Sequence, residues 1–352
     1  MRPTDTSTTT QQTAGWRTTS PTSADPLLGS DATLPGGTDL VIRVRGMRKT
    51  YALGGGRRRT AVDGLDLDVA RGEVLALLGP NGAGKSTATE VLEGYRHRDS
   101  GEVAVLGVDP WRAPLSWRAR VGIVLQDTSE SLDLTVMELL RHWATLYPHA
   151  RPPTGVAELV GLGDRLRTRV AALSGGQRRR LDVGLAVIGR PELLFLDEPT
   201  TGFDPEARRQ FWGVLEDLRD AGTTILLTTH YLEEAARLAD RVAVVAEGRL
   251  VACAPPAELG GPLRDVAVVR WQAPDGSERQ ERTTQPSALL RRLLAEQPPA
   301  AAGPGAGEVP GLRVERASLE DVYLTLVDHA AAVAASSTET SSTETSSAEV
   351  VA

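Results

Sequence analysis

The sequence has a single cysteine and no long apolar run, and each shortage excludes a class of protein. A single cysteine, Cys253, excludes an intramolecular disulfide and any zinc site built from several cysteines. No run of about 18 apolar residues occurs, so the sequence predicts no helix that crosses a bilayer. The net charge of -7 does not suit a chain that coats nucleic acid or an anionic membrane. The N-terminal MRPTDTSTTTQQT lacks the apolar core of a secretion signal.

Composition divides the chain into four parts. Residues 1–38 and 330–352 are rich in Thr, Ser, Pro and Ala and contain too little apolar surface to offset the entropy of ordering. We therefore expect disordered tails at both ends. Between them, residues 39–262 carry every motif described below, and residues 263–329 form a second block that we expect to be a small accessory domain.

The first block alternates apolar strands with helical sequence. Four short apolar runs, EVLALLG, VGIVLQ, ELLFLDE and TTILLTTH, are each followed by polar or helical residues. This pattern predicts an α/β fold with a parallel sheet that is covered on both faces. Because ligands of such sheets bind beyond the carboxyl ends of the strands, the residues that follow each run are the candidate site.

The stretch GPNGAGKST follows the first of these strands and opens a helix, which is the context of a phosphate loop. Its glycines allow backbone N–H groups to close around phosphates, Lys85 reaches the β- and γ-phosphates, and the Ser86 hydroxyl suits Mg²⁺. The only lysines of the chain are Lys49 and Lys85, so a lysine at this position is itself informative. The predicted nucleotide-binding residues of the loop are Gly79, Pro80, Asn81, Gly82, Ala83, Gly84, Lys85, Ser86 and Thr87.

Polar residues follow the other strands. Asp197 ends ELLFLD, where an unpaired charge is costly to bury and a magnesium ion would offset that cost. The adjacent Glu198 is a candidate base for an attacking water. Gln126 follows VGIVL and is a candidate for binding Mg²⁺ or positioning water, and His230 follows TTILLTT and is a candidate hydrogen-bond donor to the γ-phosphate.

The stretch LSGGQRRR is a second possible phosphate-binding site of the chain. A serine and two glycines open a helix-like segment, and helix starts present unpaired N–H groups to anions. The arginines at 178–180 are expected to lie on a mostly solvated face of that helix.

In this order, the motifs GPNGAGKST, Gln126, LSGGQ, LLFLDEPTTGFDP and His230 resemble the ATP-binding subunits of ATP-binding cassette (ABC) transporters over about residues 39–262. The resemblance implies ATP as substrate, Mg²⁺ held by Ser86, Gln126 and Asp197, and catalysis by Glu198, His230 and Gln126. It implies that Tyr51 stacks on adenine. It also implies a small N-terminal β portion and a helical subdomain over about 128–190.

The same resemblance implies a role for the second phosphate-binding site, LSGGQ. In this family two subunits pack head to tail, and the LSGGQ helix of one covers the ATP held by the phosphate loop of the other. Ser174, Gly175, Gly176 and Gln177 would thus serve the ATP of a second copy of the chain. Asp204, in a TGFDP loop where Phe203 replaces the more usual leucine, would lie in the loop that crosses the dimer.

The C-terminal block resembles drug-efflux ATPases of the daunorubicin-resistance type, because it ends in ASLEDVYLTLV. VAVVRW, SALLRRLLAE and GLRVERASLEDVYLTL are expected to build one compact αβ unit. This branch implies an exporter of drugs or antibiotics, with a separate integral-membrane permease that holds the ATPase at the cytoplasmic face of the cell membrane.

Two alternatives remain at this stage. One is a cytosolic, non-transport ABC ATPase that acts on ribosomes or nucleic acid. Such relatives usually carry two cassettes, long coiled coils or zinc sites, which are missing here, and the acidic charge argues for no nucleic-acid partner. The other is a nucleotide-binding module without turnover, against which the presence of both Glu198 and His230 argues.

Overall fold

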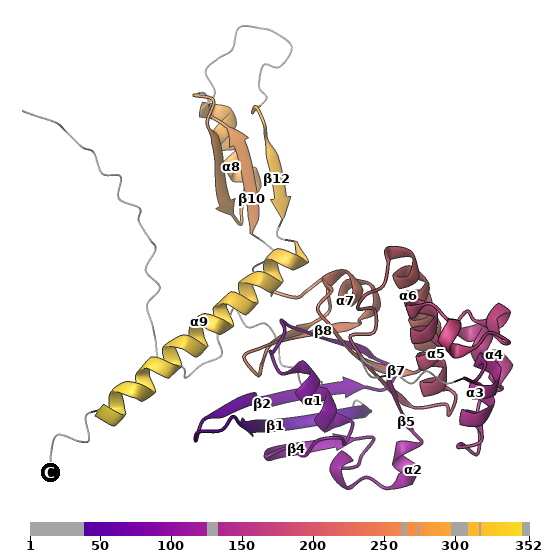
Figure 1. The fold of residues 1–352 in the computed structure, drawn as a ribbon. Coiled ribbons are helices and arrows are strands. Elements are labelled where there is room, and N and C mark those ends of the chain that lie inside the picture. Colours follow the sequence, from indigo (N-terminus) through magenta and orange to yellow (C-terminus); the bar gives the residue numbers. More distant parts are fainter. Residues whose placement is uncertain are drawn as a thin grey trace, which may run out of the picture.

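The computed structural model describes residues 39–124, 133–261, 263, 266–273, 275–296, 309–316 and 318–346. Within these residues the strands form one six-stranded and two three-stranded sheets (Figure 1). Gln126, a predicted site residue, lies outside the described residues, as does the predicted tail at 1–38.

The six-stranded sheet has the order β5-β6-β7-β3-β8-β9. The first five strands of this order, β5, β6, β7, β3 and β8, pair in parallel. The last strand, β9, pairs antiparallel with β8 at the edge of the sheet. The strand bounds are β3 Val74–Leu78, β5 Val121–Val124, β6 Leu193–Asp197, β7 Thr224–Thr229, β8 Arg241–Ala246 and β9 Arg249–Ala254. The four apolar runs of the sequence are β3, β5, β6 and β7, so the predicted α/β class is confirmed.

This sheet separates two apolar cores, because successive side chains of a strand point to opposite faces. Ala76 and Leu78 of β3 belong to one core, and Leu75 and Leu77 belong to the other. Side chains of α5 Gly175–Val187, α6 Pro205–Asp220 and α7 Leu232–Leu238 contribute to the first core, together with the helices of the insertion and the last helix, which are described below. The second is closed by α1, Lys85–Leu92, and by the N-terminal sheet.

The N-terminal sheet is antiparallel with the order β2-β1-β4, which confirms the expected small β portion. Its strands are β1 Leu40–Ala52, β2 Arg58–Ala70 and β4 Ser100–Val105. After β4, the short helices η1 Pro110–Arg112 and α2 Leu115–Arg118 lead to β5. The β1–β2 hairpin extends to the phosphate loop, which makes its tip part of the candidate site.

The expected helical insertion lies between β5 and β6. It consists of α3 Val136–Ala144, α4 Pro153–Leu159, η2 Gly163–Arg165, η3 Val170–Ala172 and the start of α5. Thr135 and Glu138 form a capping box that satisfies the first N–H groups of α3. The insertion therefore delivers LSGGQ at the exposed beginning of a long helix.

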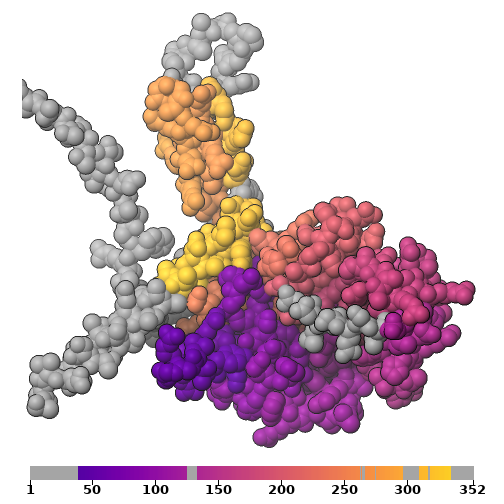
Figure 2. Space-filling view, viewed as in Figure 1, coloured from indigo at the N-terminus to yellow at the C-terminus, as the bar shows by residue number. Residues whose placement is uncertain are grey.

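The C-terminal block builds a second, small unit. Its three strands have the order β11-β10-β12, and one helix packs against them through a small core of Val269, Leu289, Leu293 and Val309. The elements are β10 Ala267–Gln272, β11 Glu278–Thr283, α8 Pro286–Glu296 and β12 Arg313–Arg316. Figures 1 and 2 show this unit standing away from the six-stranded sheet.

The last helix, α9 Leu319–Ser346, corrects two expectations. Val322 and Leu326 pack into the core of the six-stranded sheet and not into the small C-terminal core. The expected disordered tail from residue 330 is also wrong at its start, because the helix continues to Ser346. Alanine is the best helix former, and AAAVAA extends a helix whose first turns are already fixed by packing.

Candidate nucleotide site

The phosphate loop joins β3 to α1, and two of its glycines are required by close packing. A Cβ on Gly79 would lie 2.2 Å from the carbonyl oxygen of Val245, and one on Gly84 would lie 2.1 Å from that of Ala61. Gly84 is also the N-cap of α1, with a φ of 104°, and no side chain caps the helix there. The first N–H groups of α1 thus remain open to an anion.

Lys85 begins α1 and is nearly buried, with 5% of its surface exposed. Its Nζ donates hydrogen bonds to the carbonyl oxygens of Gly79 at 2.7 Å and Pro80 at 3.2 Å. Burial lowers the pKa of Lys85, while the charges of Glu198 and Asp197 act in the opposite direction. The ammonium group is thereby fixed inside the loop, where a triphosphate would meet it.

Asp197 and Glu198 lie at the carboxyl end of β6. Oδ1 of Asp197 accepts a hydrogen bond of 2.5 Å from the hydroxyl of Thr228 on β7. Glu198 has a φ of 42°, a left-handed conformation that is uncommon for a residue with a side chain. Such backbone strain gathers at functional sites, where the surroundings enforce it.

The carboxylate of Glu198 lies between two of the other predicted site residues. Its Oε1 is 3.8 Å from Nζ of Lys85, and its Oε2 is 3.3 Å from Nδ1 of His230. The Thr201 hydroxyl donates to the same Oε2 at 3.3 Å. Three motifs that lie far apart in the sequence therefore meet at the carboxyl ends of the strands β3, β6 and β7.

The oxygen donors at this edge suit a hard cation such as Mg²⁺. Ser86 is exposed in the first turn of α1, and one carboxylate oxygen of Asp197 remains outside the bond with Thr228. Across the described ranges, no group of three or more His, Cys, Asp or Glu side chains forms a metal cluster. A cation here would thus depend on a hydroxyl, one carboxylate and the oxygens of its substrate.

Tyr51 lies beside the phosphate loop. Its hydroxyl is 3.3 Å from Oγ1 of Thr87, a loop residue at the start of α1. The guanidinium of Arg96 lies over the ring, 5.2 Å from its centroid, and is hydrogen-bonded to Glu90. Nζ of Lys49 is 5.9 Å from the same centroid. An aromatic ring with cations around it thus borders the loop.

Ser174 is the N-cap of α5. Its hydroxyl accepts a hydrogen bond from the backbone N–H of Gln177 at 3.3 Å, and the Gln177 side chain accepts one from the backbone N–H of Ser174 at 3.1 Å. Ser174 and Gly175 are exposed. The capping box fixes the shape of the helix start and leaves it open to a partner.

The arginines at 178–180 differ from the expectation of a solvated face. Arg179 is 8% exposed and donates to the carbonyl oxygens of Asp197 at 2.8 Å and Pro199 at 3.2 Å. A spacing of four residues places Arg179 on the same helix face as the buried Val183 and Val187, and this was a usable signal in the sequence. The arginine links the start of α5 to the acidic end of β6.

Asp204 has a local role that the sequence interpretation missed. It is the N-cap of α6, and its carboxylate accepts hydrogen bonds from the N–H groups of Glu206 at 2.9 Å and Ala207 at 2.8 Å. Aspartate followed by proline at the first helical position is a usual helix start and would have predicted this cap.

A buried polar cluster behind the site was also missed. Glu234 of α7 and Thr200 are both fully buried. Oε1 of Glu234 accepts hydrogen bonds from the Thr200 hydroxyl at 2.9 Å and from Nε1 of Trp212 at 3.1 Å. Thr200 follows Glu198 closely, and Glu234 follows His230, so this cluster joins the two loops that carry those residues.

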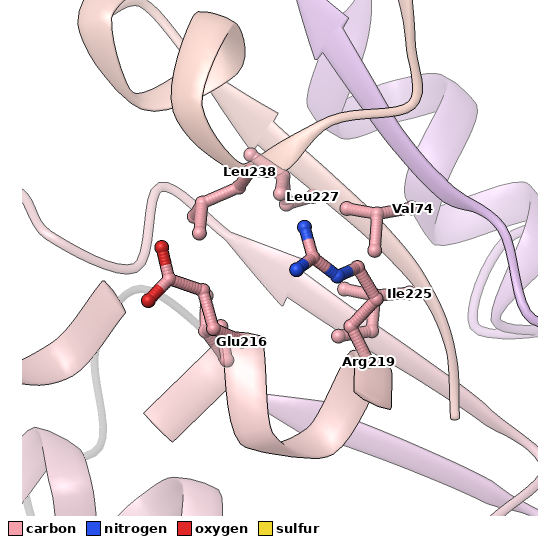
Figure 3. A pocket seen from close by; sticks show the side chains of 7 residues that line it. Val74, Glu216, Arg219, Ile225, Leu227 and Leu238 are labelled. Atoms are coloured by element: carbon pink, nitrogen blue, oxygen red, sulfur yellow. The ribbon is translucent and has the colours of Figure 1, made fainter. Parts of the chain in front are cut away.

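A shallow pocket lies near the amino-terminal end of β3, away from the phosphate loop, and Figure 3 shows side chains that line it. It is lined by Val74, Leu215, Glu216, Arg219, Ile225, Leu227 and Leu238. Val74 begins β3, whereas the phosphate loop follows the other end of that strand. The pocket therefore takes no part in the candidate site.

Several known proteins similar to this chain are ATP-binding proteins of ABC transport systems. A family model described as ABC transporter matches residues 62–201. The daunorubicin/doxorubicin resistance ATP-binding protein DrrA of Streptomyces peucetius is 39% identical over 318 residues, covering 82% of this chain and 93% of that protein. The Nod factor export ATP-binding protein I of Ralstonia nicotianae is 42% identical over 230 residues, covering 63% of this chain and 70% of that protein. The structure of cbiO1 from Clostridium perfringens, part of the ABC transporter complex cbiONQ, has a TM-score of 0.54 and 26% identity, covering 62% of this chain and 90% of that one.

The fold and the site together define a phosphate-loop ATPase of the ATP-binding cassette type. The chain belongs to the ATP-binding proteins of ABC transporters, in the drug-efflux branch, and is an ATPase that powers an exporter. No helix among the described residues is long and apolar enough to cross a membrane.

Proposed function

We propose that the chain binds and hydrolyses ATP to drive the export of drugs or antibiotics through a separate integral-membrane permease, to which it is bound at the cytoplasmic face of the membrane. The position of the Glu198 carboxylate between Lys85 and His230 carries the proposal for hydrolysis. The resistance to daunorubicin and doxorubicin named for the Streptomyces peucetius relative supports the cargo class. In this proposal residues 39–262 are the ATPase domain and the small C-terminal unit is accessory.

ATP binding rests on two parts of the site. The backbone N–H groups of the loop after Pro80, in residues 81–87, surround the β- and γ-phosphates. Lys85 exchanges its bonds with the carbonyl oxygens of Gly79 and Pro80 for phosphate oxygens. Adenine stacks on the Tyr51 ring, which borders the loop. The close approach of Tyr51 to Thr87 supports one continuous site for base and phosphates.

Hydrolysis follows from the carboxylate and the histidine. Glu198 orients a water and accepts its proton as the water oxygen bonds to the γ-phosphorus and the bond to the leaving ADP oxygen breaks. His230 donates a hydrogen bond to a γ-phosphate oxygen, and Gln126 positions the water. Mg²⁺, held by Ser86, Gln126 and Asp197, would neutralise charge on the β- and γ-phosphates.

Two copies of the chain enclose the nucleotides. Ser174, Gly175, Gly176 and Gln177 of one copy cover the γ-phosphate held by the other, because the exposed start of α5 offers N–H groups to an anion. Asp204 shapes the loop that crosses the dimer. ATP binding closes this homodimer, hydrolysis reopens it, and the permease follows the cycle.

Efflux of daunorubicin from cells that express the chain with its permease tests the proposal. We expect daunorubicin to accumulate less in these cells than in cells with the permease alone. A matched strain with Lys85→Ala should accumulate as much as the permease-only strain, because the ammonium group is lost from the phosphate loop. Equal efflux by wild type and Lys85→Ala would refute an ATP-driven role.

A further inference from the structure

Tyr51 has a direct partner across the β1–β2 hairpin. In the antiparallel register of these strands Tyr51 stands opposite Arg59. Residues directly opposite each other place their side chains on the same face of a sheet, with Cβ atoms about 5 Å apart. The hairpin therefore presents an aromatic ring and a guanidinium side by side.

Both side chains reach the phosphate loop. The Tyr51 hydroxyl is 3.3 Å from Oγ1 of Thr87, and Nη2 of Arg59 donates a hydrogen bond of 3.1 Å to the carbonyl oxygen of Gly82. A Cβ on Gly82 would lie 3.1 Å from the same nitrogen, so the guanidinium lies against the open face of this glycine. Arg59 is a rim residue of the loop, on the side of the adenine platform.

The guanidinium of Arg59 has further N–H groups that could donate hydrogen bonds to a ligand. It carries five N–H groups, and the bond to Gly82 uses one of them. Arg59 is exposed, and it forms no ion pair with any carboxylate among the described residues. Other arginines of the same sheet are paired, for example Arg45 with Asp68 and Arg48 with Asp63.

Carboxylates near Lys85 offset part of its positive charge, so a second cation would strengthen the binding of a triphosphate. Lys85 lies 3.8 Å from Glu198, and the charges of Glu198 and Asp197 both act on it. Two carboxylates and one ammonium therefore stand where the γ-phosphate would lie. Arg59, which forms no ion pair with a carboxylate among the described residues, would add to the attraction for a polyanion, and guanidinium groups match phosphate oxygens in a planar, two-donor geometry.

We propose that Arg59 is a further nucleotide-binding residue, whose guanidinium contacts the α-phosphate of ATP while Tyr51 holds the base. The inference rests on the proposed ATP site. Arg59 stands opposite Tyr51, the proposed adenine-stacking residue, and contacts the loop at Gly82, so we place it at the phosphate nearest the nucleoside. ATP and ADP share that phosphate, so both should depend on Arg59.

The test measures dissociation constants of the full-length chain by competition against a fluorescent ATP analogue. ATP, ADP and inorganic tripolyphosphate are the three competitors. Arg59→Ala should weaken ATP and ADP equally, by about tenfold, as expected for one charge-assisted contact, and should weaken tripolyphosphate as well. Tyr51→Ala should weaken ATP and ADP but leave tripolyphosphate unchanged, because it removes only the base platform.

Arg58→Ala is the matched control. Arg58 neighbours Arg59 on β2 but points to the opposite face of the hairpin, so its removal takes away the same charge without touching the loop. Arg58→Ala should leave all three affinities within twofold, and Arg59→Lys should restore part of the loss. Equal losses in Arg58→Ala and Arg59→Ala would overturn the inference, as would a loss for ATP that spares ADP.

The outcome separates this inference from the proposed function. A wild-type chain that does not bind ATP contradicts the proposed function itself. A wild-type chain that binds ATP, together with an Arg59→Ala chain that binds it equally well, contradicts only the role of Arg59.

Discussion

Oε2 of Glu198 lies 3.3 Å from Nδ1 of His230, although the two residues follow different strands of the sheet. The same carboxylate faces Lys85 through its other oxygen, at 3.8 Å. One side chain thus connects the phosphate loop, the acidic end of β6 and the residue that follows β7. The first predictions concern this carboxylate.

Glu198→Gln should preserve ATP binding and abolish most of the hydrolysis. The amide keeps the shape of the side chain but does not accept the proton of the attacking water. We expect ATP turnover to fall by about 100-fold or more, with the dissociation constant of ATP changed by less than about threefold. Release of phosphate, measured with the permease present, gives the turnover. A drop in turnover matched by the same drop in affinity would count against a role as the base.

The Glu198→Gln chain should also dimerise on ATP. Unhydrolysed ATP keeps the phosphate loop of one copy and the start of α5 of the other together, so sizing chromatography should show a dimer with ATP and Mg²⁺ and a monomer with ADP. Adding Ser174→Arg should break this dimer, because the longer side chain obstructs the exposed helix start. ATP should still bind to the double variant. A dimer that survives Ser174→Arg contradicts the assignment of LSGGQ to the partner's ATP.

Glu93 makes the stability of the chain depend on pH. Burial, with smaller contributions from Asp197 and Glu90, raises the pKa of this carboxyl from 4.5 to about 8. Between about pH 5 and 8 the folded chain therefore holds a proton that the unfolded chain has lost, so stability falls as the pH rises. The slope from this group is at most about 1.4 kcal/mol per pH unit.

Glu93→Gln removes this titration and keeps the shape of the side chain. The free energy of unfolding by urea, measured at pH 5, 6, 7 and 8, should fall with pH less steeply than in the wild type. The variant should gain most over the wild type at pH 8. Glu102→Gln, which alters an exposed carboxyl on β4, should leave the slope unchanged. A wild-type slope retained in Glu93→Gln would assign the pH dependence to another group.

The buried cluster around Glu234 should contribute strongly to stability. Glu234→Ala leaves the Thr200 hydroxyl and the Trp212 indole N–H without their acceptor in the core, at a cost of about 2–4 kcal/mol in the free energy of unfolding. Urea unfolding measures this loss. Glu233→Ala on the same helix alters an exposed carboxyl and should change stability by less than about 0.5 kcal/mol. Equal effects of the two substitutions would contradict a structural role for the cluster.

Local features of the sequence determined much of the fold. The strands β3, β5, β6 and β7 are continuous apolar runs of a length that suits buried parallel strands, and the glycines of residues 79–84 fix a turn before a helix. The proposed roles of Lys85, Asp197 and Glu198 are inferred from their places next to these strands. Such features depend on neighbours along the chain, which is why they can be read without a structure.

The tertiary structure alone decided which of these features meet. The pairing of Glu198 with His230 depends on β6 and β7 being neighbours in the sheet, and the pairing of Tyr51 with Arg59 depends on the register of one hairpin. The docking of α9 on the main core and the burial of Arg179 are contacts between distant segments. Strand order and register arise from packing that involves the whole domain, so neither propensity nor periodicity of a short segment specifies them.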